Sequence, residues 1–121
     1  MRSSFIITLL VGLLFSYPTA ASDLEAGDVI KVYGYCNIEG AVKLEQTAQK
    51  DVKKAKALVD FYMENGICQN SVVNGRPFLA GLRQVVSTFK DAEHDFFEVW
   101  EVDIIGIPGV YYILNRLENV S

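Results

Sequence analysis

The stretch of the chain with the most chemistry surrounds its only histidine. Asp91, Glu93, His94 and Asp95 place three carboxylates within a few residues of one imidazole. A histidine held beside a carboxylate can act as a general base. Closely spaced carboxylates can also bind a hard metal ion. These two kinds of chemistry are the ones that the stretch could support.

The metal-binding hypothesis fails at two positions. Residues 91, 93 and 95 match the start of a calcium-binding loop. However, Phe96 stands at the sixth position, where that loop needs glycine, and Val102 stands at the twelfth, where it needs glutamate. Zinc is disfavoured because the chain has one histidine and two cysteines. We therefore expect no metal and no cofactor, and a solvated hairpin turn over residues 91–95.

Catalysis of other kinds lacks partner residues. No serine or cysteine is marked by a motif as a nucleophile beside His94. Glu98 and Glu101 flank Trp100, but strand alternation sends them to opposite faces, so they cannot form a facing carboxylate pair. No glycine-rich phosphate loop is present. We assign no catalytic residue and keep a small exported enzyme centred on His94 as an alternative.

The two cysteines, Cys36 and Cys68, flank the longest helical pattern. Because the chain has the marks of export, we expect them to form an intramolecular disulfide. Two buried free thiols and an intermolecular bond remain alternatives. One straight helix over residues 40–65 would be about 39 Å long, too long for a bond that needs Cα atoms within about 7 Å. The bond therefore requires a broken helix, and the best break is at Thr47–Asp51, where Asp51 could cap a second helix.

Apolar residues at helical spacing define the buried stripe of this segment. They are Ala41, Leu44, Ala48, Val52, Ala55, Val59 and Tyr62. Asn37 is a plausible N-cap, and Asn65-Gly66 marks the end of the helix. Lys50, Lys53, Lys54 and Lys56 form the densest basic group of the chain. This group either docks an acidic partner or is a solvated helix face.

The first 21 residues have the features of a secretory signal peptide. Arg2 precedes a short apolar run, Phe5–Phe15, and Thr19-Ala20-Ala21 supplies small residues for cleavage after Ala21. An uncleaved membrane anchor is the alternative. We expect a single small domain over Ser22–Ser121, secreted or periplasmic. Its acidic excess is one charge larger than the net −4 of the full chain, because Arg2 is lost. Such a balance argues against nucleic acid as a partner.

Four segments have strand character, and a type II turn is expected at Pro108-Gly109. The strands are Val29–Cys36, Leu82–Phe89, Phe96–Ile104 and Val110–Asn115. The last three are joined by short connections and predict an antiparallel meander. The predicted fold class is therefore α+β, in the order β-α-β-β-β, with the helical segment packed on the sheet.

An aromatic face of the sheet is the best functional indication. If the helical segment covers one side of the sheet, five residues would line the uncovered side. They are Tyr33, Tyr35, Phe97, Val99 and Tyr111. An exposed aromatic patch on a small exported domain often marks a protein interface. A loop such as Phe78–Gly81 covering this patch is the alternative.

We therefore predict a non-catalytic, inhibitor-like or interaction module. It would bind a protein partner, or a second copy of itself, through the open sheet face or the exposed edge of the meander. A structural subunit of an envelope or particle assembly is a further alternative.

Overall fold

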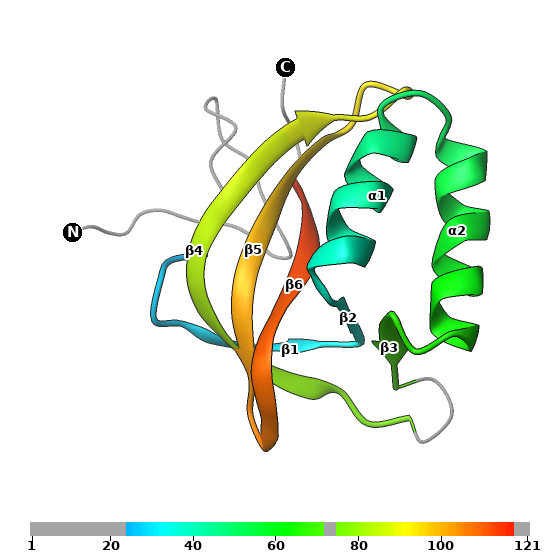
Figure 1. Cartoon of the computed structure of the whole chain (residues 1–121). Helices are drawn as coiled ribbons and strands as arrows, with labels where there is room; N and C mark the ends of the chain where they lie inside the picture. The colour runs from blue at the N-terminus through cyan, green and yellow to red at the C-terminus, as the bar shows by residue number, and fades with distance from the viewer. Residues whose placement is uncertain (1–23, 72–74, 118–121) are drawn as a thin grey trace.

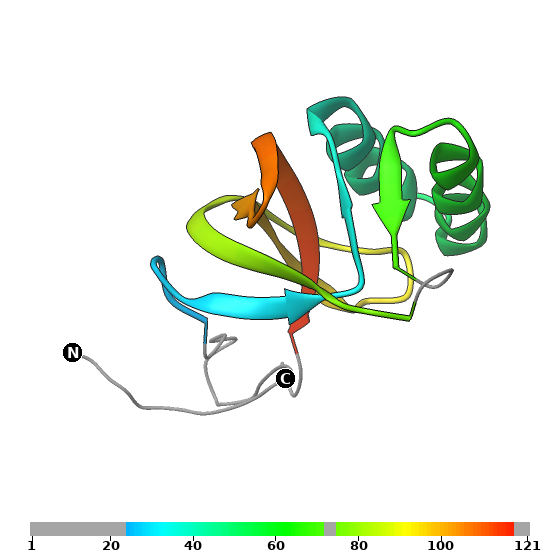
Figure 2. The same ribbon diagram turned by 90° about the horizontal axis from the view of Figure 1, so that it is seen from below.

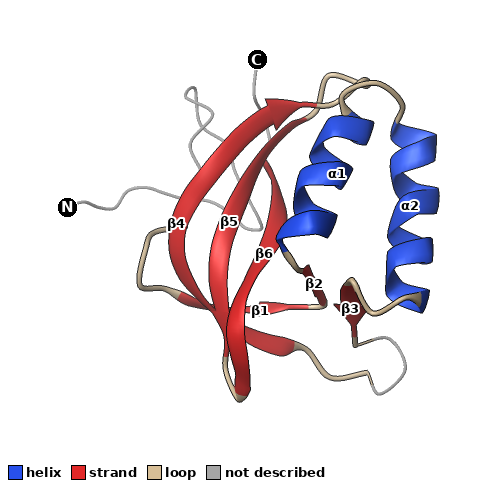
Figure 3. Cartoon of the chain, viewed as in Figure 1, coloured by secondary structure: helices blue, strands red, loops and turns tan. Residues whose placement is uncertain are grey.

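The computed structural model describes residues 24–71 and 75–117, where two helices pack on a six-stranded antiparallel sheet (Figure 1, Figure 3). The helices are α1 (Ile38–Ala48) and α2 (Val52–Glu64). The strands are β1 (Val29–Val32), β2 (Gly34–Cys36), β3 (Cys68–Asn70), β4 (Phe78–Lys90), β5 (Phe96–Ile104) and β6 (Ile107–Leu117). The α+β class is confirmed. The predicted signal peptide, residues 1–21, lies outside the described residues. No helix in the described part is long and apolar enough to span a membrane.

The helical segment is broken where the sequence predicts. Asn37 begins α1, and its side chain accepts a hydrogen bond from the Gly40 N–H at 2.9 Å. Asp51 has an extended backbone, and its carboxylate accepts from the Lys54 N–H at 3.1 Å. Because Asp51 caps a new helix, α2 runs back beside α1 instead of continuing it. The predicted hairpin is thus confirmed.

The strand order across the sheet is β1-β4-β5-β6-β2-β3, and all neighbouring strands are antiparallel. The predicted chain order β-α-β-β-β is wrong in two places. Two strands precede the helices instead of one, and β3 follows α2 before the meander begins. β3 has three residues, which is too short for an alternating pattern to be recognised.

The predicted strand Val29–Cys36 is divided at Tyr33. β1 pairs with β4 at one edge of the sheet, whereas β2 pairs with β6 and β3 towards the other edge. Since β1 and β2 follow each other directly, the sheet curls until its two ends approach. Figure 2 shows the chain turning a corner between these strands. Alternation restarts at this corner, so Val32 and Tyr35, three residues apart, contact the same core cluster.

The meander of β4, β5 and β6 forms the long part of the sheet. The predicted strand Phe96–Ile104 is confirmed to the residue, and its two neighbours are longer than predicted. The turn predicted at Pro108-Gly109 is wrong. The chain reverses at Ile105-Gly106, where Gly106 has a φ of 89°, and Pro108-Gly109 lies within β6. The positive φ required at the turn is therefore supplied by the earlier glycine.

Apolar side chains are buried on both faces of the sheet. One face carries the largest cluster, which includes Trp100 and Val102 and which β1 helps to enclose. On the other face, Ala41 and Ala48 of α1 pack against Phe89 and Val99. A third cluster joins both helices to the cysteines and consists of Cys36, Leu44, Tyr62 and Cys68, with partly buried neighbours. The helices are thus fixed to the sheet by two separate contacts.

Candidate functional site

The two cysteines form the predicted intramolecular disulfide. Cys36 and Cys68 lie directly opposite each other on β2 and β3, with Cα atoms 4.0 Å apart. The bond joins the strand that enters the helical hairpin to the strand that leaves it. It therefore fixes the two ends of the hairpin to each other.

The five residues of the predicted interface do not lie together on one exposed surface. Tyr35 is buried, and its ring is 4.8 Å from that of Tyr111 in the cluster that β1 encloses. Phe97 and Val99 belong to the cluster under α1. Tyr33 alone of the five is exposed, at the corner between β1 and β2. The predicted interface requires the helices to cover the Trp100 face of β5, and it requires strand alternation to continue through Tyr33. In the structure α1 covers the Val99 face, and alternation restarts at Tyr33.

The environment of Tyr35 alters its titration. Burial raises the pKa of the Tyr35 phenol above its ordinary value of 10.0, and the neighbouring Tyr111 adds to this effect. The neutral form of Tyr35 is therefore favoured in the folded chain. Tyr35 therefore contributes a neutral, buried side chain to the core.

The acidic stretch around His94 forms a tight turn between β4 and β5. The Asp91 carboxylate is buried and accepts hydrogen bonds from the Glu93 and Asp95 N–H groups, both at 2.9 Å. Asp95 pairs with Arg116 at 3.0 Å. His94 is exposed and has a φ of 70°. Within the described ranges, no three metal-binding side chains are grouped to hold an ion. The contacts of Asp91 and Asp95 organise the turn.

The edge of the meander is only partly covered. β1 pairs with β4 over Phe78–Gly81, and no described strand pairs with the outer side of β4 from Arg83 to Lys90. Bulges between Leu82 and Gln84 and between Val85 and Ser87 interrupt the register of this strand. Bulges disturb the regular spacing of backbone donors and acceptors and so oppose pairing with a further strand. This edge is a weak docking site.

A more developed feature is a groove between α1 and α2. It consists of two adjoining hollows of about 410 Å³ and about 210 Å³, and Lys43 lines both. The larger hollow is also lined by Ile38, Glu39, Val42 and Tyr62. The smaller is also lined by Gln46, Thr47, Lys50, Asp51 and Lys54. On α1 these positions lie opposite the buried stripe Ala41, Leu44 and Ala48, so the groove opens on the outer side of the hairpin.

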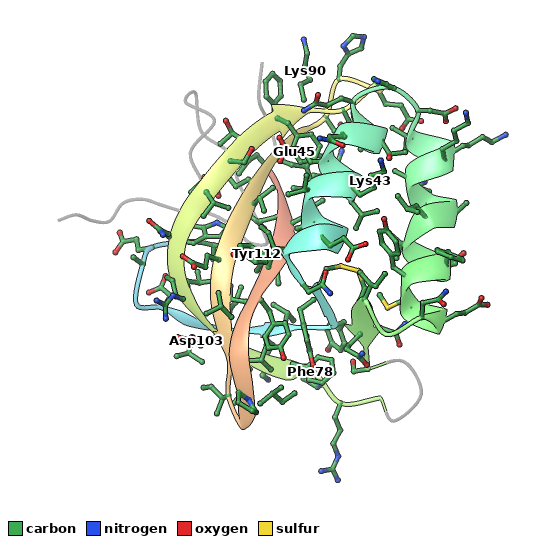
Figure 4. All side chains as sticks on the ribbon, in the orientation of Figure 1. Lys43, Glu45, Phe78, Lys90, Asp103 and Tyr112 are labelled. Carbon is green, nitrogen blue, oxygen red and sulfur yellow. A yellow bond between two sulfur atoms is a disulfide. The ribbon has the colours of Figure 1, made fainter. Side chains whose placement is uncertain are left out.

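The two ends of the groove differ in chemistry. At the start of α1, Ile38 and Val42 are 54% and 45% exposed. Near the connection between the helices, Lys50 and Lys54 face the groove. Lys43 lies between the two ends, and Figure 4 shows it on the side of α1 towards α2, away from Glu45. The groove therefore changes from apolar to basic along its length.

The lysines of the groove carry charges that the described residues do not neutralise. None of Lys43, Lys50 and Lys54 forms an ion pair within residues 24–71 and 75–117, where the ion pairs shown involve Arg83 and Arg116. Asp51 is also at this end, but its carboxylate accepts from the Lys54 backbone. The groove therefore presents three ammonium groups that a ligand can pair with, those of Lys50 and Lys54 at its basic end and that of Lys43 between the two ends.

The walls of the groove are held firmly. The disulfide fixes the ends of the hairpin, and the Glu45 carboxylate accepts a hydrogen bond from the Ser87 hydroxyl at 2.9 Å, joining α1 to β4. The end of α1 also accepts a hydrogen bond, because the Ala48 carbonyl accepts from the Ala92 N–H at 2.8 Å. Preorganised walls lower the entropy cost of binding.

Sequence reasoning recognised the lysines but not the groove. Its buried stripe on α1 holds Ala41, Leu44 and Ala48, whereas Ile38 and Val42 fall four residues apart outside that stripe. Two large apolar side chains on the polar side of a helix are a signal that could have been used. Comparisons with protein families, with curated proteins and with solved structures found no match for this chain.

Proposed function

We propose that this chain is a small, non-catalytic protein-binding module that acts outside the cytoplasm, secreted or periplasmic. One observation carries the proposal. Two large apolar side chains that line the groove, Ile38 and Val42, are 54% and 45% exposed. Phe61, which is 54% exposed, has its ring 6.0 Å from that of Tyr62, a further lining residue. Contiguous exposed apolar surface next to polar residues is typical of protein interaction sites.

The openness of the groove favours a macromolecular partner over a small substrate. Sites for small ligands enclose roughly 70–90% of the ligand surface. Here Ile38 and Val42 are about half exposed, and Tyr62 is the one residue of α2 that lines the apolar end. A protein surface can cover such a shallow groove without being enclosed by it.

The disulfide supports the compartment in this proposal. Disulfides persist in oxidising compartments and are rare in the cytosol. The Cys36–Cys68 bond agrees with the signal-peptide pattern of residues 1–21 in pointing to export. The mass of the protein recovered from its own host tests this: a full-length, reduced chain would remove the export part of the proposal.

Site-specific photocrosslinking tests the binding role. A photoreactive residue replaces Val42 in the full chain, and a matched control replaces Val86 on β4. These two valines have nearly equal exposure, 45% and 46%. We expect crosslinks from position 42 to another protein and none from position 86. Equal labelling from both positions, or none from position 42, would contradict the proposed docking surface.

A further inference from the structure

We propose that the groove between α1 and α2 binds one amphipathic helix of a protein partner, with apolar side chains at one end and acidic side chains at the other. This inference rests on the proposed function and adds the chemistry of the partner.

A helical partner follows from the backbone of the groove. The walls are helices, whose N–H and C=O groups are bonded within the helices except at their ends. An extended peptide would find no strand edge to pair with there, and its own backbone groups would lose water without gaining partners. A helix satisfies its own backbone and can place a ridge of side chains between α1 and α2. The groove therefore favours a third helix.

The polarity of the partner follows from the polarity of the groove. Ile38, Val42 and Tyr62 favour apolar side chains at one end, which Glu39 also lines. The exposed Phe61 ring lies beside this end, with its centroid 6.0 Å from that of the Tyr62 ring. At the other end, Lys50 and Lys54 require carboxylates. The groove between these ends is short, because α1 with 11 residues is about 16 Å long. An occupant of roughly three helical turns spans it.

Because the whole chain carries a negative net charge, its lysines can attract an acidic partner only at short range. The net charge is −4, so an acidic partner is not attracted from a distance. Only charges within about one Debye length, roughly 8–10 Å in ordinary salt, are felt strongly by an exposed ligand. The lysine end must therefore act through direct ion pairs. Such pairs fix the orientation of the bound helix more than they raise its affinity.

A second copy of this chain does not fit the groove. If two copies placed their α1 helices antiparallel, the apolar end of each would face the lysines of the other, and Glu39 would be the one acidic residue at that end to pair with them. If they placed them parallel, Lys43, Lys50 and Lys54 would face the same residues of the other copy. The antiparallel arrangement brings apolar side chains against charged ones, and the parallel arrangement brings like charges together. The occupant is therefore a different chain.

The test uses the full chain, in its oxidised form, and two synthetic helical peptides of about 15 residues, roughly four turns. Both carry leucines on one face of the first half. One carries glutamates on the same face of the second half, and the other carries lysines there. Binding is measured by fluorescence anisotropy, and its location by amide chemical shifts. We expect the acidic peptide to bind at least about tenfold more tightly, with shifts along residues 38–54.

Charge-reversed variants identify the basic end. Lys50→Glu with Lys54→Glu should weaken binding of the acidic peptide at least tenfold and strengthen binding of the basic one. The matched control, Lys53→Glu with Lys56→Glu, makes the same charge change on α2 outside the groove and should leave both affinities unchanged. Circular dichroism confirms that each variant is folded. If the Lys50→Glu, Lys54→Glu variant binds the basic peptide more tightly than the wild type does, the two lysines contact the ligand directly. A variant that had only lost structure would not gain this affinity.

Three outcomes would overturn this inference. Equal binding of both peptides, or equal effects of the two double variants, would show that the groove does not select acidic residues. No binding of the acidic peptide would remove the helical partner. Self-association of the chain that is lost in Val42→Glu would make a second copy the occupant. If crosslinking from Val42 to another protein persists in the first two cases, the proposed function stands and only the partner class fails.

Discussion

Gly40 of α1 lies directly against the disulfide, so that a Cβ atom at this position would be 3.3 Å from the Cys68 sulfur. It would also be 2.8 Å from the Ile67 Cγ2 methyl and 3.2 Å from the Cys36 Cβ. Real Cβ atoms are essentially never found as close to another heavy atom as the 2.8 Å that separates this position from the Ile67 Cγ2 methyl. The first turn of α1 thus depends on a residue without a side chain.

Gly40→Ala should therefore destabilise the chain although alanine favours helices. Overpacking costs about 1–3 kcal/mol, and the gain in helix propensity offsets about 1 kcal/mol. We expect a net loss of up to about 2 kcal/mol in the free energy of unfolding, measured by urea denaturation. Ala57→Gly, at an exposed site on α2, measures the propensity contribution alone. A Gly40→Ala chain more stable than the wild type would show that Ile67 moves aside without cost.

Loss of the disulfide should weaken the hairpin most. Cys36 and Cys68 are separated by 32 positions, and closing such a loop stabilises a fold by about 3–4 kcal/mol in the chain-entropy model. We expect the Cys36→Ala, Cys68→Ala double variant to lose stability of this size. Hydrogen exchange should increase more in α1 and α2 than in β5. Equal protection of the helices in both proteins would contradict this prediction.

Asp51 should be needed for the break between the helices. Asp51→Ala removes the acceptor for the Lys54 N–H and should cost about 1 kcal/mol of unfolding free energy. Asp51→Asn keeps an acceptor and should retain most of this stability. Asp60→Ala, at an exposed position of α2, is the charge-matched control. An equal loss in all three variants would assign the effect to charge and not to capping.

Replacement of His94 by glycine should stabilise the turn. The φ of 70° at His94 is favourable for glycine and strained for a side chain with a Cβ atom. We expect His94→Gly to gain up to about 1 kcal/mol, whereas His94→Ala should gain nothing. This variant also separates stability from chemistry. If a substrate is found whose conversion ceases in folded His94→Gly, the enzyme alternative replaces the binding module.

Tyr35 should make the chain less stable at alkaline pH. Its pKa is raised in the folded state by burial, so the unfolded chain releases the phenol proton first. The stability that the neutral Tyr35 phenol contributes is fully present below about pH 10, and it is lost as the pH rises through the pKa of Tyr35 in the folded state. Tyr35→Phe should remove this part of the slope. Urea unfolding from about pH 8 to about pH 11 measures it, and identical slopes for both proteins would contradict the prediction.

Local features of the fold were predictable because neighbouring residues determine them. Asn37 and Asp51 cap helices with their own side chains, and the Phe96–Ile104 strand is defined by its alternation. The disulfide was predicted from the two cysteines and the export pattern. Its formation required the helical segment between the cysteines to be broken. Each of these inferences needs only residues close in the chain, or one covalent constraint.

Features that depend on distant residues were not predictable. Tyr35 is buried because the chain turns at Tyr33 and because β2 pairs with β6, far along the sequence. Val99 is buried because α1 covers its face of the sheet and not the other. The exposed side of α1 could be inferred only once the covered side was known. The candidate groove therefore emerged from the tertiary structure.

The position of the disulfide bears on the order in which the chain can fold. Residues 34–70 contain β2, both helices and β3, and these pair with one another before any residue of the meander is needed. Because synthesis proceeds from the N-terminus, this unit is complete before β4 emerges. β1 must wait for β4, and β2 for β6. The oxidised hairpin can therefore form first and serve as a template on which the sheet closes.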